Sequence, residues 1–508
     1  MEYLVTTQEM QNLDRATIDQ VGIGALVLME RAAMAACEEI LCRYKGKKKN
    51  QRVLILAGCG NNGADGLALA RMLSEEGFEV QVVICGNRNK ATDQWKTQYK
   101  ILKHFPVETG CKTILSEYDI LVDALFGVGL SREISGEYAD IVHAFNGAVG
   151  FKVALDIPSG VHADNGRIMG CATRVDLTVC FAFPKRGLLF YPGCEYAGEL
   201  VVRNIGIGEA AMESKPQMFR YTESVKELMP LRDEAGNKGT FGKALIAAGS
   251  RNMAGAAVLA AKACYRVGTG MVKVLTEECN REILQTAIPE SLFVPTVNAG
   301  DVQANLPLYD ENVMLFDWPD VLAIGPGLGT DEQAYVLVST FLKKSVLPLV
   351  MDADALNLLA AHKELMEEVM KQGAAGRCLI LTPHVGELSR LTGKSIKEIK
   401  EDPVKIAMEL AKRLRCIIVS KDARTLVCCE GEGICMNTTG NSGMSTAGSG
   451  DVLTGIITGL LALGMSGFEA ASTGVYLHGL AGDYAAKRLG KNGLLAGDIA
   501  LAIADVLR

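Results

Sequence analysis

The sequence predicts an α/β protein with two three-layer domains, each built on a mostly parallel sheet. Short apolar runs rich in Val, Ile and Leu alternate with helical patterns, as they do in right-handed βαβ units. Loops containing glycine or proline follow most of these runs. The chain has 508 residues, 49% of them apolar and 22% charged, which is ordinary globular composition with ample length for two to three domains.

Charge and composition exclude several classes of protein. The net charge is −7 and the only basic run is Lys47-Lys48-Lys49, so we expect no nucleic-acid partner. Met1–Met10 lacks the pattern of a signal peptide, and the most apolar stretch, Val452–Met465, is interrupted by glycines and too short for a membrane. The 15 cysteines are scattered without a C-x-x-C pair. Reduced thiols in a cytoplasmic protein are therefore expected.

The first domain is expected to span residues 1–208. A helical segment over Thr7–Arg43 comes first, and a second helical pattern covers Ala64–Glu76. The expected strands are Arg52–Ala57, Glu79–Cys85, Asp119–Ala124, Phe151–Asp156 and Val175–Phe181. Residues 209–224 have mixed polarity with no clear period, and we interpret them as a linker.

The second domain is expected to span residues 225–508 and to repeat this alternation. Its expected strands are Lys243–Ala248, Met271–Leu275, Asp320–Ile324, Pro348–Asp352, Cys378–Thr382 and Cys416–Ser420. An Ala-rich helix covers Ala254–Val267. A glycine loop opens a second apolar helix over Val452–Leu463.

Polar loops follow several strands of the first domain, and in a parallel sheet such loops converge on one crevice. Their glycines leave N–H groups free to approach a phosphate, and Arg132 can neutralise one. Asn62, Asp123 and Ser159 offer hard oxygen donors at three strand ends, suited to a loosely held monovalent cation. The alternative is structural: Asn-Gly often only makes a turn, and Asp123 and Asp156 can cap loop N–H groups.

Taken in order, NNGADG, VDALFGVGLSR and LDIPSG resemble the NAD(P)H-hydrate epimerase family over about the first 205 residues. The resemblance implies a Rossmann-like three-layer domain that binds K⁺ through Asn62, Asp123 and Ser159. It also implies that hydrated dinucleotide contacts Asn61, Asn62, Gly63, Ala64, Asp65, Gly127, Val128, Gly129, Leu130, Ser131, Arg132, Glu133 and Asp156.

The chemistry of such a substrate suits a carboxyl group. The hydroxyl is attached to the carbon beside the ring nitrogen, whose lone pair can expel it once an acid protonates it. Water can then return from the other face and invert the centre. We expect a single carboxyl, Asp156, to act first as acid and then as base.

The glycine loop Ala447-Gly448-Ser449-Gly450-Asp451 is the most informative feature of the second domain. Its N–H groups would form an anion site for a transferred phosphoryl group, and Asp451 would take a proton from the acceptor hydroxyl. The loop does not match G-x-x-x-x-G-K-S/T, so a Walker-type NTPase is not supported. The alternative is a Gly-rich helix entry with an acidic residue near its start.

Together with GPGLG, DADALN and TPHVGE, this loop resembles the NAD(P)H-hydrate dehydratase branch of the ribokinase-like superfamily over about residues 225–508. The resemblance implies Mg²⁺ and ADP as cofactors, with Asp352 and Glu387 helping to hold the metal. It implies nucleotide binding by Lys421, Asp422, Ala423, Arg424, Thr425 and Gly450. It implies that Ala256, Gly327, His384 and Asp451 contact the hydrated dinucleotide, although His384 can equally be a loop hydrogen-bonder.

Both resemblances together predict a repair enzyme for hydrated NADH and NADPH (NADHX and NADPHX). The epimerase would interconvert the R and S forms, and the dehydratase would restore the S form while ADP is consumed to AMP and phosphate. Ala-rich helices favour a homo-oligomer. Two rivals remain: a ribokinase-like vitamin kinase with an accessory domain, and a non-enzymatic scaffold that binds protein partners or RNA.

Overall fold

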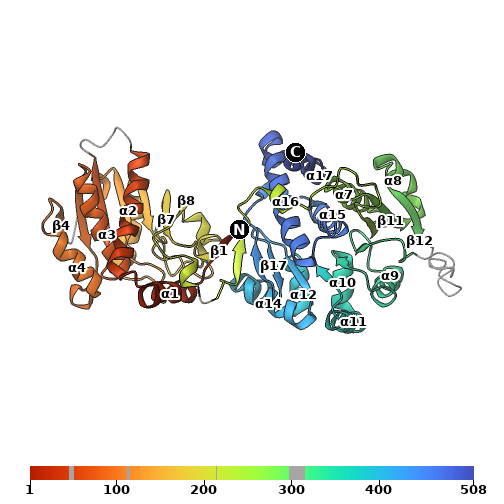
Figure 1. Cartoon of the computed structure of the whole chain (residues 1–508), viewed down its shortest axis with the longest axis horizontal. Helices are drawn as coiled ribbons and strands as arrows, with labels where there is room; N and C mark the ends of the chain where they lie inside the picture. The colour runs from red at the N-terminus through yellow and green to blue at the C-terminus, as the bar shows by residue number, and fades with distance from the viewer. Residues whose placement is uncertain (45–50, 111–114, 213, 297–314) are drawn as a thin grey trace. The chain divides into compact units, whose positions relative to one another are not determined.

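The computed structural model describes residues 1–44, 51–110, 115–212, 214–296 and 315–508, and it divides into two compact units. The N-terminal unit is Glu2–Met218 and the C-terminal unit is Phe219–Arg508 with Met1. Figure 1 colours the first unit red to yellow and the second mainly green to blue. The division falls within residues 209–224, where the linker was expected, and the lysines 47–49 lie outside the described residues.

The sheet of the N-terminal unit has the order β4-β3-β2-β5-β6-β7-β8, and every pair of neighbours is parallel. Its strands are β2 Arg52–Ala57, β3 Glu79–Ile84, β4 Glu108–Gly110, β5 Ile120–Ala124, β6 Phe151–Leu155, β7 Leu177–Phe181 and β8 Glu199–Arg203; β1 is Glu2–Leu4. The helices are α1 Thr7–Ala16, η1 Thr17–Val21, α2 Ala25–Arg43, α3 Asn61–Glu75, η2 Arg88–Lys90, α4 Asp93–Leu102, η3 Leu115–Glu117, α5 Glu137–Gly147, η4 Arg186–Leu188, η5 Gly193–Glu195 and η6 Glu209–Ala211.

Alternation along β2 produces the three layers. Val53, Ile55 and Ala57 join the core under α1 to α4, whereas Leu54 and Leu56 join the core under α5. Because both faces are covered, the whole strand is apolar, as expected for a parallel sheet. The strand order reverses between β2 and β5, and the crevice outside the carboxyl ends at such a reversal is where open α/β sheets bind ligands.

The C-terminal unit has the sheet order β9-β18-β17-β16-β15-β14-β13-β10-β11-β12. Pairing is parallel from β16 through β12 and antiparallel between β16, β17 and β18. The strands are β9 Met218–Arg220, β10 Lys243–Ala247, β11 Met271–Glu277, β12 Leu292–Thr296, β13 Val321–Ile324, β14 Leu349–Met351, β15 Leu379–Leu381, β16 Ile417–Ser420, β17 Leu426–Cys429 and β18 Gly433–Met436.

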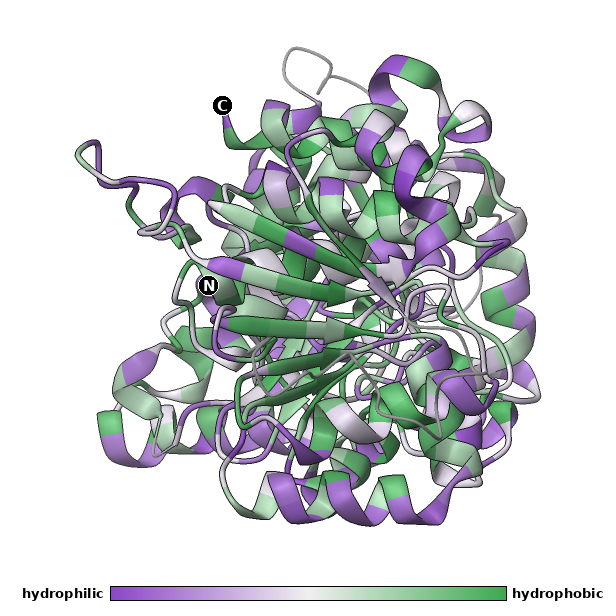
Figure 2. Cartoon of the chain, turned by 90° about the vertical axis from the view of Figure 1, so that its right-hand side faces the viewer, coloured by the Kyte–Doolittle hydropathy of each residue, from purple (hydrophilic) through white to green (hydrophobic). Residues whose placement is uncertain are grey.

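Helices cover this second sheet as well. They are α6 Val225–Leu228, α7 Ala254–Arg266, η7 Glu278–Asn280, α8 Arg281–Ala287, α9 Glu332–Lys343, α10 Asp354–Ala361, α11 Lys363–Ala374, α12 Val385–Thr392, α13 Ile396–Glu401, α14 Pro403–Leu414, η10 Ser442–Met444, α15 Ser449–Ala462, α16 Gly467–Leu489, η11 Lys491–Gly493 and α17 Ala496–Leu507. Figure 2 shows the strands largely in hydrophobic green and purple segments on the surrounding helices. No described helix is long and apolar enough to span a membrane.

Several expected boundaries were wrong for local reasons. The helical segment Thr7–Arg43 is interrupted between η1 and α2, where Gly22 has a φ of 85°. Helix α3 begins at Asn61 rather than Ala64, because Gly60 adopts the extended N-cap conformation. Helix α15 begins at Ser449, so Gly450 and Asp451 belong to its first turn. The β17–β18 hairpin was not anticipated, and the expected linker contains strand β9.

Candidate active sites

A cavity of about 690 Å³ opens at the carboxyl ends of β2, β5 and β6 in the N-terminal unit. Most of the expected substrate-binding residues line it. They are Asn61, Asn62, Asp65, Gly127, Val128, Gly129, Leu130, Ser131, Arg132 and Asp156. Apolar side chains from α1 and α2, including Met10 and Leu28, also line it, although no sequence pattern indicated this. The helical N-terminal segment thus contributes a wall of the site.

Three expected substrate contacts lie elsewhere. Ala64 is fully buried, and a Cβ added to Gly63 would come within 1.9 Å of the carbonyl oxygen of Gly58. These two residues therefore seat α3 against the loop after β2. Glu133 is not among the described residues that line the cavity.

Asp123, Ser159 and Asn62 do come together at the ends of β5, β6 and α3. Asp123 is fully buried and accepts hydrogen bonds from the Ser159 N–H at 2.7 Å, the Ser159 hydroxyl at 2.6 Å and the Thr173 hydroxyl at 2.5 Å. Burial raises the pKa of Asp123, and these hydrogen bonds oppose the shift. The carboxyl therefore caps its loop, as the structural alternative held.

An unsatisfied oxygen nevertheless marks this cluster as a candidate cation site. The Asn62 amide donates to the Phe126 carbonyl at 3.0 Å, while its buried Oδ1 has no hydrogen-bond partner among the described residues. The Ser159 hydroxyl accepts from the Phe126 N–H at 2.9 Å. A buried amide oxygen without a partner is costly, and a bound cation would satisfy it.

Asp156 has a partner that the sequence reasoning missed. It follows β6 in the left-handed conformation, with a φ of 64°, and its Oδ1 forms an ion pair with Lys185. Lys185 is 1% exposed, and its ammonium also donates to the Phe181 carbonyl at 2.9 Å. The loop after β7 carries this lysine, and its position beyond a strand end was the available signal.

Two further carboxyl groups lie in this cavity near Asp156, the residue expected to act as acid and then as base. Asp14 from α1 and Asp65 from α3 line it together with Asp156. Burial raises the pKa of Asp65 well above its ordinary value, the charges of Asp156 and Asp14 raise it further, and Lys185 opposes them. Burial, followed by the charge of Asp156, also raises the pKa of Asp14. Sequence spacing cannot reveal such shifts, because they depend on burial and on charges from other elements.

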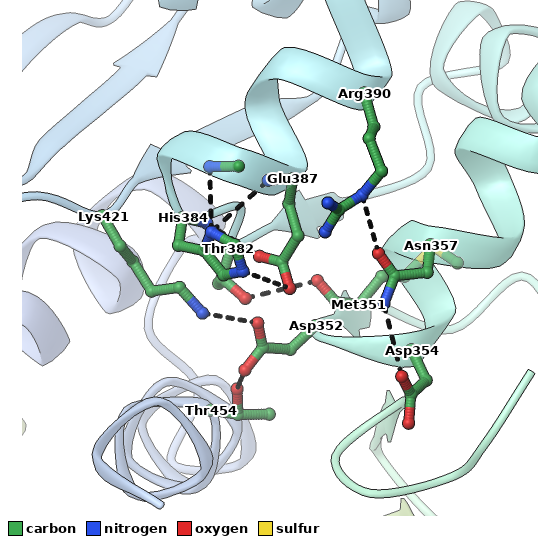
Figure 3. Close-up of polar contacts among 11 residues, drawn as sticks. Met351, Asp352, Asp354, Asn357, Thr382, His384, Glu387, Arg390, Lys421 and Thr454 are labelled. Carbon is green, nitrogen blue, oxygen red and sulfur yellow. Dashed lines mark hydrogen bonds and ion pairs between the residues drawn. The ribbon is translucent and has the colours of Figure 1, made fainter. Parts of the chain in front are cut away.

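In the C-terminal unit the ends of β14, β15 and β16 bring polar groups together (Figure 3). Asp352 is 1% exposed and accepts from Lys421 Nζ at 2.7 Å and from the Thr454 hydroxyl at 2.7 Å. Burial works to raise the pKa of Asp352, but Lys421 and the two hydroxyls of Thr454 and Thr382 lower it below its ordinary value. Asp352 is therefore a buried, fully engaged carboxylate.

His384 caps helix α12 in this cluster. Its Nδ1 accepts from the Gly386 N–H at 2.9 Å, and Glu387 in turn accepts from the His384 N–H at 2.7 Å. Burial and the charges of Lys421 and Arg390 lower the pKa of His384, whereas Asp352 opposes them. The loop hydrogen bond foreseen as the alternative exists, and the imidazole remains 54% exposed.

Asp451 lies in the first turn of α15, beside the same cluster. Burial and the charge of Asp352 raise its pKa to about 7, and Lys421 opposes the shift. A Cβ on Gly450 would lie 3.2 Å from Lys421 Nζ, so the glycine backbone passes close to the lysine. Ser449 at the helix start lies 3.3 Å from His478 Nε2. The start of α15 is thus half-buried and contains glycines, and it carries Asp451, a carboxyl whose pKa is about 7.

Comparison with known proteins assigns both units. Residues 244–504 match the family described as NAD(P)H-hydrate dehydratase, and residues 25–187 match the YjeF-related protein N-terminus. A bifunctional NAD(P)H-hydrate repair enzyme of Moorella thermoacetica is 36% identical over 100% of this chain and 97% of its own length. The chain belongs to the bifunctional NAD(P)H-hydrate repair enzyme family. The expected family is confirmed, and a vitamin kinase is not favoured.

Other members of the repair enzyme family match at similar levels. The Escherichia coli protein of that name is 32% identical over 96% of this chain and 90% of its own length. Among solved structures, an ADP/ATP-dependent NAD(P)H-hydrate dehydratase from Bacillus subtilis, co-crystallised with ATP/Mg²⁺, is 30% identical. It covers 56% of this chain and 94% of its own, with a TM-score of 0.47.

The remaining expected contacts of this repair enzyme are Gly327, in the loop after β13, and Ala256, in α7. A Cβ on Gly327 would come within 2.8 Å of the Ala256 Cβ, so these two residues lie side by side. A relay that sequence reasoning missed supports this loop: Asp354 accepts from the Gly329 N–H at 2.9 Å and from Asn357 at 3.3 Å. Arg390 donates to Asn357 at 3.1 Å (Figure 3).

The expected nucleotide contacts are less closely gathered. Lys421 reaches Asp352, but Asp422 and Ala423 are exposed on the loop between β16 and β17. The Thr425 hydroxyl donates to the Asp422 carbonyl at 3.2 Å, which folds this loop on itself. Lys421 and Gly450 are thus the expected nucleotide residues that the contacts tie to the Asp451 cluster.

Proposed function

We propose that this chain restores hydrated NADH and NADPH, with an epimerase in residues 1–208 and an ADP-dependent dehydratase in residues 225–508, joined by residues 209–224. The observation that carries the proposal is Asp451. Its carboxyl lies in the first turn of α15 with a pKa of about 7, beside Lys421 and a loop of small residues.

In the proposed dehydratase, Asp451 takes the proton of the substrate hydroxyl as that oxygen accepts a phosphoryl group from ADP. A pKa near 7 suits this step, because a general base works best when its pKa is close to the working pH. The resulting phosphate is a far better leaving group than hydroxide. The ring nitrogen then drives its loss and restores the dihydronicotinamide.

A positive charge and backbone N–H groups lie where the transferred phosphoryl group would bind. Lys421 lies against Gly450, where α15 directs its first N–H groups outward. Asp352 and Glu387 are the carboxyls that would hold Mg²⁺; burial, together with the charge of Asp352 and opposed by Lys421, raises the pKa of Glu387 to about 7. A divalent cation held there would offset the charge on the transferred phosphate.

In the proposed epimerase, Asp156 transfers a proton to or from the hydroxyl of the ring carbon. The buried ion pair with Lys185 fixes the position of that carboxyl in the cavity. K⁺ fits the cluster of Asn62, Asp123 and Ser159, where the Oδ1 of Asn62 has no partner among the described residues. A monovalent cation there would stabilise the loop of Phe126–Arg132, against which the substrate would bind.

The same proposal includes a cytoplasmic location and a homo-oligomer. None of the cysteines that the structure describes forms a disulfide bond, which fits a reducing compartment. Helix α2 exposes Leu26, Val27 and Met34, which is consistent with self-association. Light scattering coupled to gel filtration would measure the oligomeric state.

The test uses the purified chain with equilibrated NADH-hydrate epimers, K⁺, Mg²⁺ and ADP. Recovery of reduced nicotinamide, followed by near-ultraviolet absorbance, should consume both epimers and stop with Asp451→Ala. Enzyme-dependent acceleration of the slow epimer's phase would establish the epimerase. Absence of recovery with either ADP or ATP would refute the proposal. ATP in place of ADP, in separate reactions, measures nucleotide preference.

A further inference from the structure

The cavity of the N-terminal unit contains a carboxyl group for which the proposed mechanism has no use. Asp65 lines the cavity together with Asp156, and of these two it is Asp156 that is ion-paired with Lys185. Inversion at the ring carbon needs a proton delivered on one face and another removed on the opposite face. A single fixed carboxyl serves only one face unless the substrate turns over.

The strand order brings Asp65 and Asp156 in from separate strands. Asp65 lies in the second turn of α3, the helix that follows β2, and Asp156 directly follows β6. Strand β5 lies between β2 and β6. Because neighbouring strands are about 4.8 Å apart, the ends of β2 and β6 are about 10 Å apart. Asp65 therefore enters the cavity from α3, which rests on β2 and β5, whereas Asp156 enters it from the end of β6.

Close packing fixes the position of Asp65. A Cβ added to Gly66 would lie 2.7 Å from the Ala124 Cβ and 3.2 Å from Ile55, so α3 rests directly on β2 and β5. Gly63 meets the Gly58 backbone in the same way. The turn that carries Asp65 is thus seated on the sheet, whereas Asp14 belongs to the separate helix α1.

The charges in the cavity favour a proton on Asp65. Burial raises its pKa first, the like charges of Asp156 and Asp14 add to the effect, and Lys185 opposes them. Lys90 and Arg132 are further charged residues of the described lining, from other loops. Of two interacting carboxyls, the one without the ammonium partner holds the proton more tightly.

We propose that Asp65 is a second catalytic carboxyl, the acid that expels the hydroxyl from one face of the ring while Asp156 takes the proton from water returning on the other. This inference rests on the proposed epimerase activity. It assigns one epimer to each carboxyl, as in two-base racemisation.

For the epimer whose hydroxyl faces Asp65, the protons and electron pairs move in the following order. The Asp65 proton moves to the hydroxyl, the carbon–oxygen bond breaks, and water leaves with the bonding pair. The nitrogen lone pair forms the carbon–nitrogen double bond of an iminium ion. Water then adds on the opposite face, the pair returns to nitrogen, and Asp156 accepts the released proton. In the reverse direction the carboxyls exchange roles.

Oxygen exchange separates this from a single-carboxyl mechanism. In H₂¹⁸O, the Asp156→Asn variant should lose inversion by about 100-fold or more, the scale of one acid–base group. It should still incorporate ¹⁸O into one epimer, because Asp65 can expel water and deprotonate its replacement on the same face. Chromatographic separation of the epimers followed by mass spectrometry measures both quantities against the uncatalysed rate.

Second variants decide which carboxyl carries the exchange. Asp65→Asn in the Asp156→Asn background should abolish it, and Asp65→Asn alone should abolish inversion. The matched control, Asp140→Asn, removes an exposed carboxyl from α5 and should leave both rates unchanged. Exchange that survives Asp65→Asn, or that disappears instead with Asp14→Asn, overturns the assignment.

Failure of the underlying activity has a different signature. If the wild-type chain does not accelerate epimer interconversion, then the proposed epimerase activity is refuted, and the inactivity of the variants follows from that. If the wild type accelerates it and Asp65→Asn inverts at a rate within about tenfold of wild type, only the role of Asp65 is overturned.

Discussion

Replacing Asp451 with asparagine should stabilise the C-terminal unit at neutral pH while abolishing dehydratase activity. Burial and the charge of Asp352 raise the pKa of Asp451 from 3.8 to about 7, against Lys421. A carboxyl whose folded pKa is raised contributes its full stability below about pH 4, and that stability is lost as the pH rises through about 7. The amide of the Asp451→Asn variant cannot ionise and escapes this loss.

The magnitude follows from the change in pKa. A rise from 3.8 to about 7, at about 1.36 kcal/mol for each pH unit, amounts to about 4 kcal/mol in full. About 2 kcal/mol of this accumulates between pH 5 and pH 7. For the C-terminal unit, with an unfolding entropy of about 2.1 cal/mol/K per residue, that corresponds to about 3 °C in Tm.

The assay is thermal unfolding of wild type and Asp451→Asn at pH 5 and pH 7, without nucleotide. The Tm advantage of the variant in the C-terminal transition should grow by that amount between the two pH values. Glu409→Gln removes an exposed carboxyl from α14 and is the matched control. If the variant has no Tm advantage, or one that does not change with pH, then the fold does not raise the pKa of Asp451. The proposal that a raised pKa suits Asp451 to act as a general base would then be refuted.

Three further results are expected in the N-terminal unit. Ser159→Ala should raise the K⁺ concentration for half-maximal epimerisation about tenfold, measured by titration with KCl, with NaCl holding ionic strength constant. Lys185→Met should lower epimerisation about 100-fold or more and leave dehydration of the S form intact, since the ion pair of Asp156 is lost. Gly66→Ala should cost about 1–3 kcal/mol in chemical denaturation because its Cβ would overlap Ala124, whereas Gly147→Ala meets open space and should not.

The local sequence predicted most of the strands, and it predicted that the sites lie at the carboxyl ends of those strands. Arg52–Ala57 was predicted with the bounds that the structure has, because a strand buried on both faces is a continuous apolar run bounded by polar residues. The parallel arrangement then requires its following loop to join those after β5 and β6. Helix starts were less predictable: Asn61 and Ser449 were assigned to loops, yet both have helical geometry.

Lys185 shows why the contacts between segments distant in the sequence could not be predicted without the structure. Lysine is almost never fully buried, so a lysine 29 residues beyond Asp156 gives no local sign that it will reach that carboxylate. The same holds for Asp354, Asn357 and Arg390, whose relay forms only when β14, α10 and α12 pack together. Motif matching identified the carboxylates, but not the contacts that Lys185 and Arg390 make with Asp156 and Asn357.

Within the part of the chain that the structure describes, each unit contains one carboxyl that is paired with a lysine and a neighbouring carboxyl that is not. In each, a lysine is committed to one carboxylate at a strand end: Lys185 to Asp156, and Lys421 to Asp352. The neighbouring carboxyl has no ammonium partner of its own among the described residues, and its pKa is raised: Asp65 in one unit and Asp451 in the other. One buried cation therefore differentiates two neighbouring carboxyls in each unit, because it pairs with one of them and leaves the other with a raised pKa. If this asymmetry governs the chemistry, moving the cation should move the pH dependence, and Lys421→Met should displace the pH profile of the dehydratase upward rather than merely lower its height.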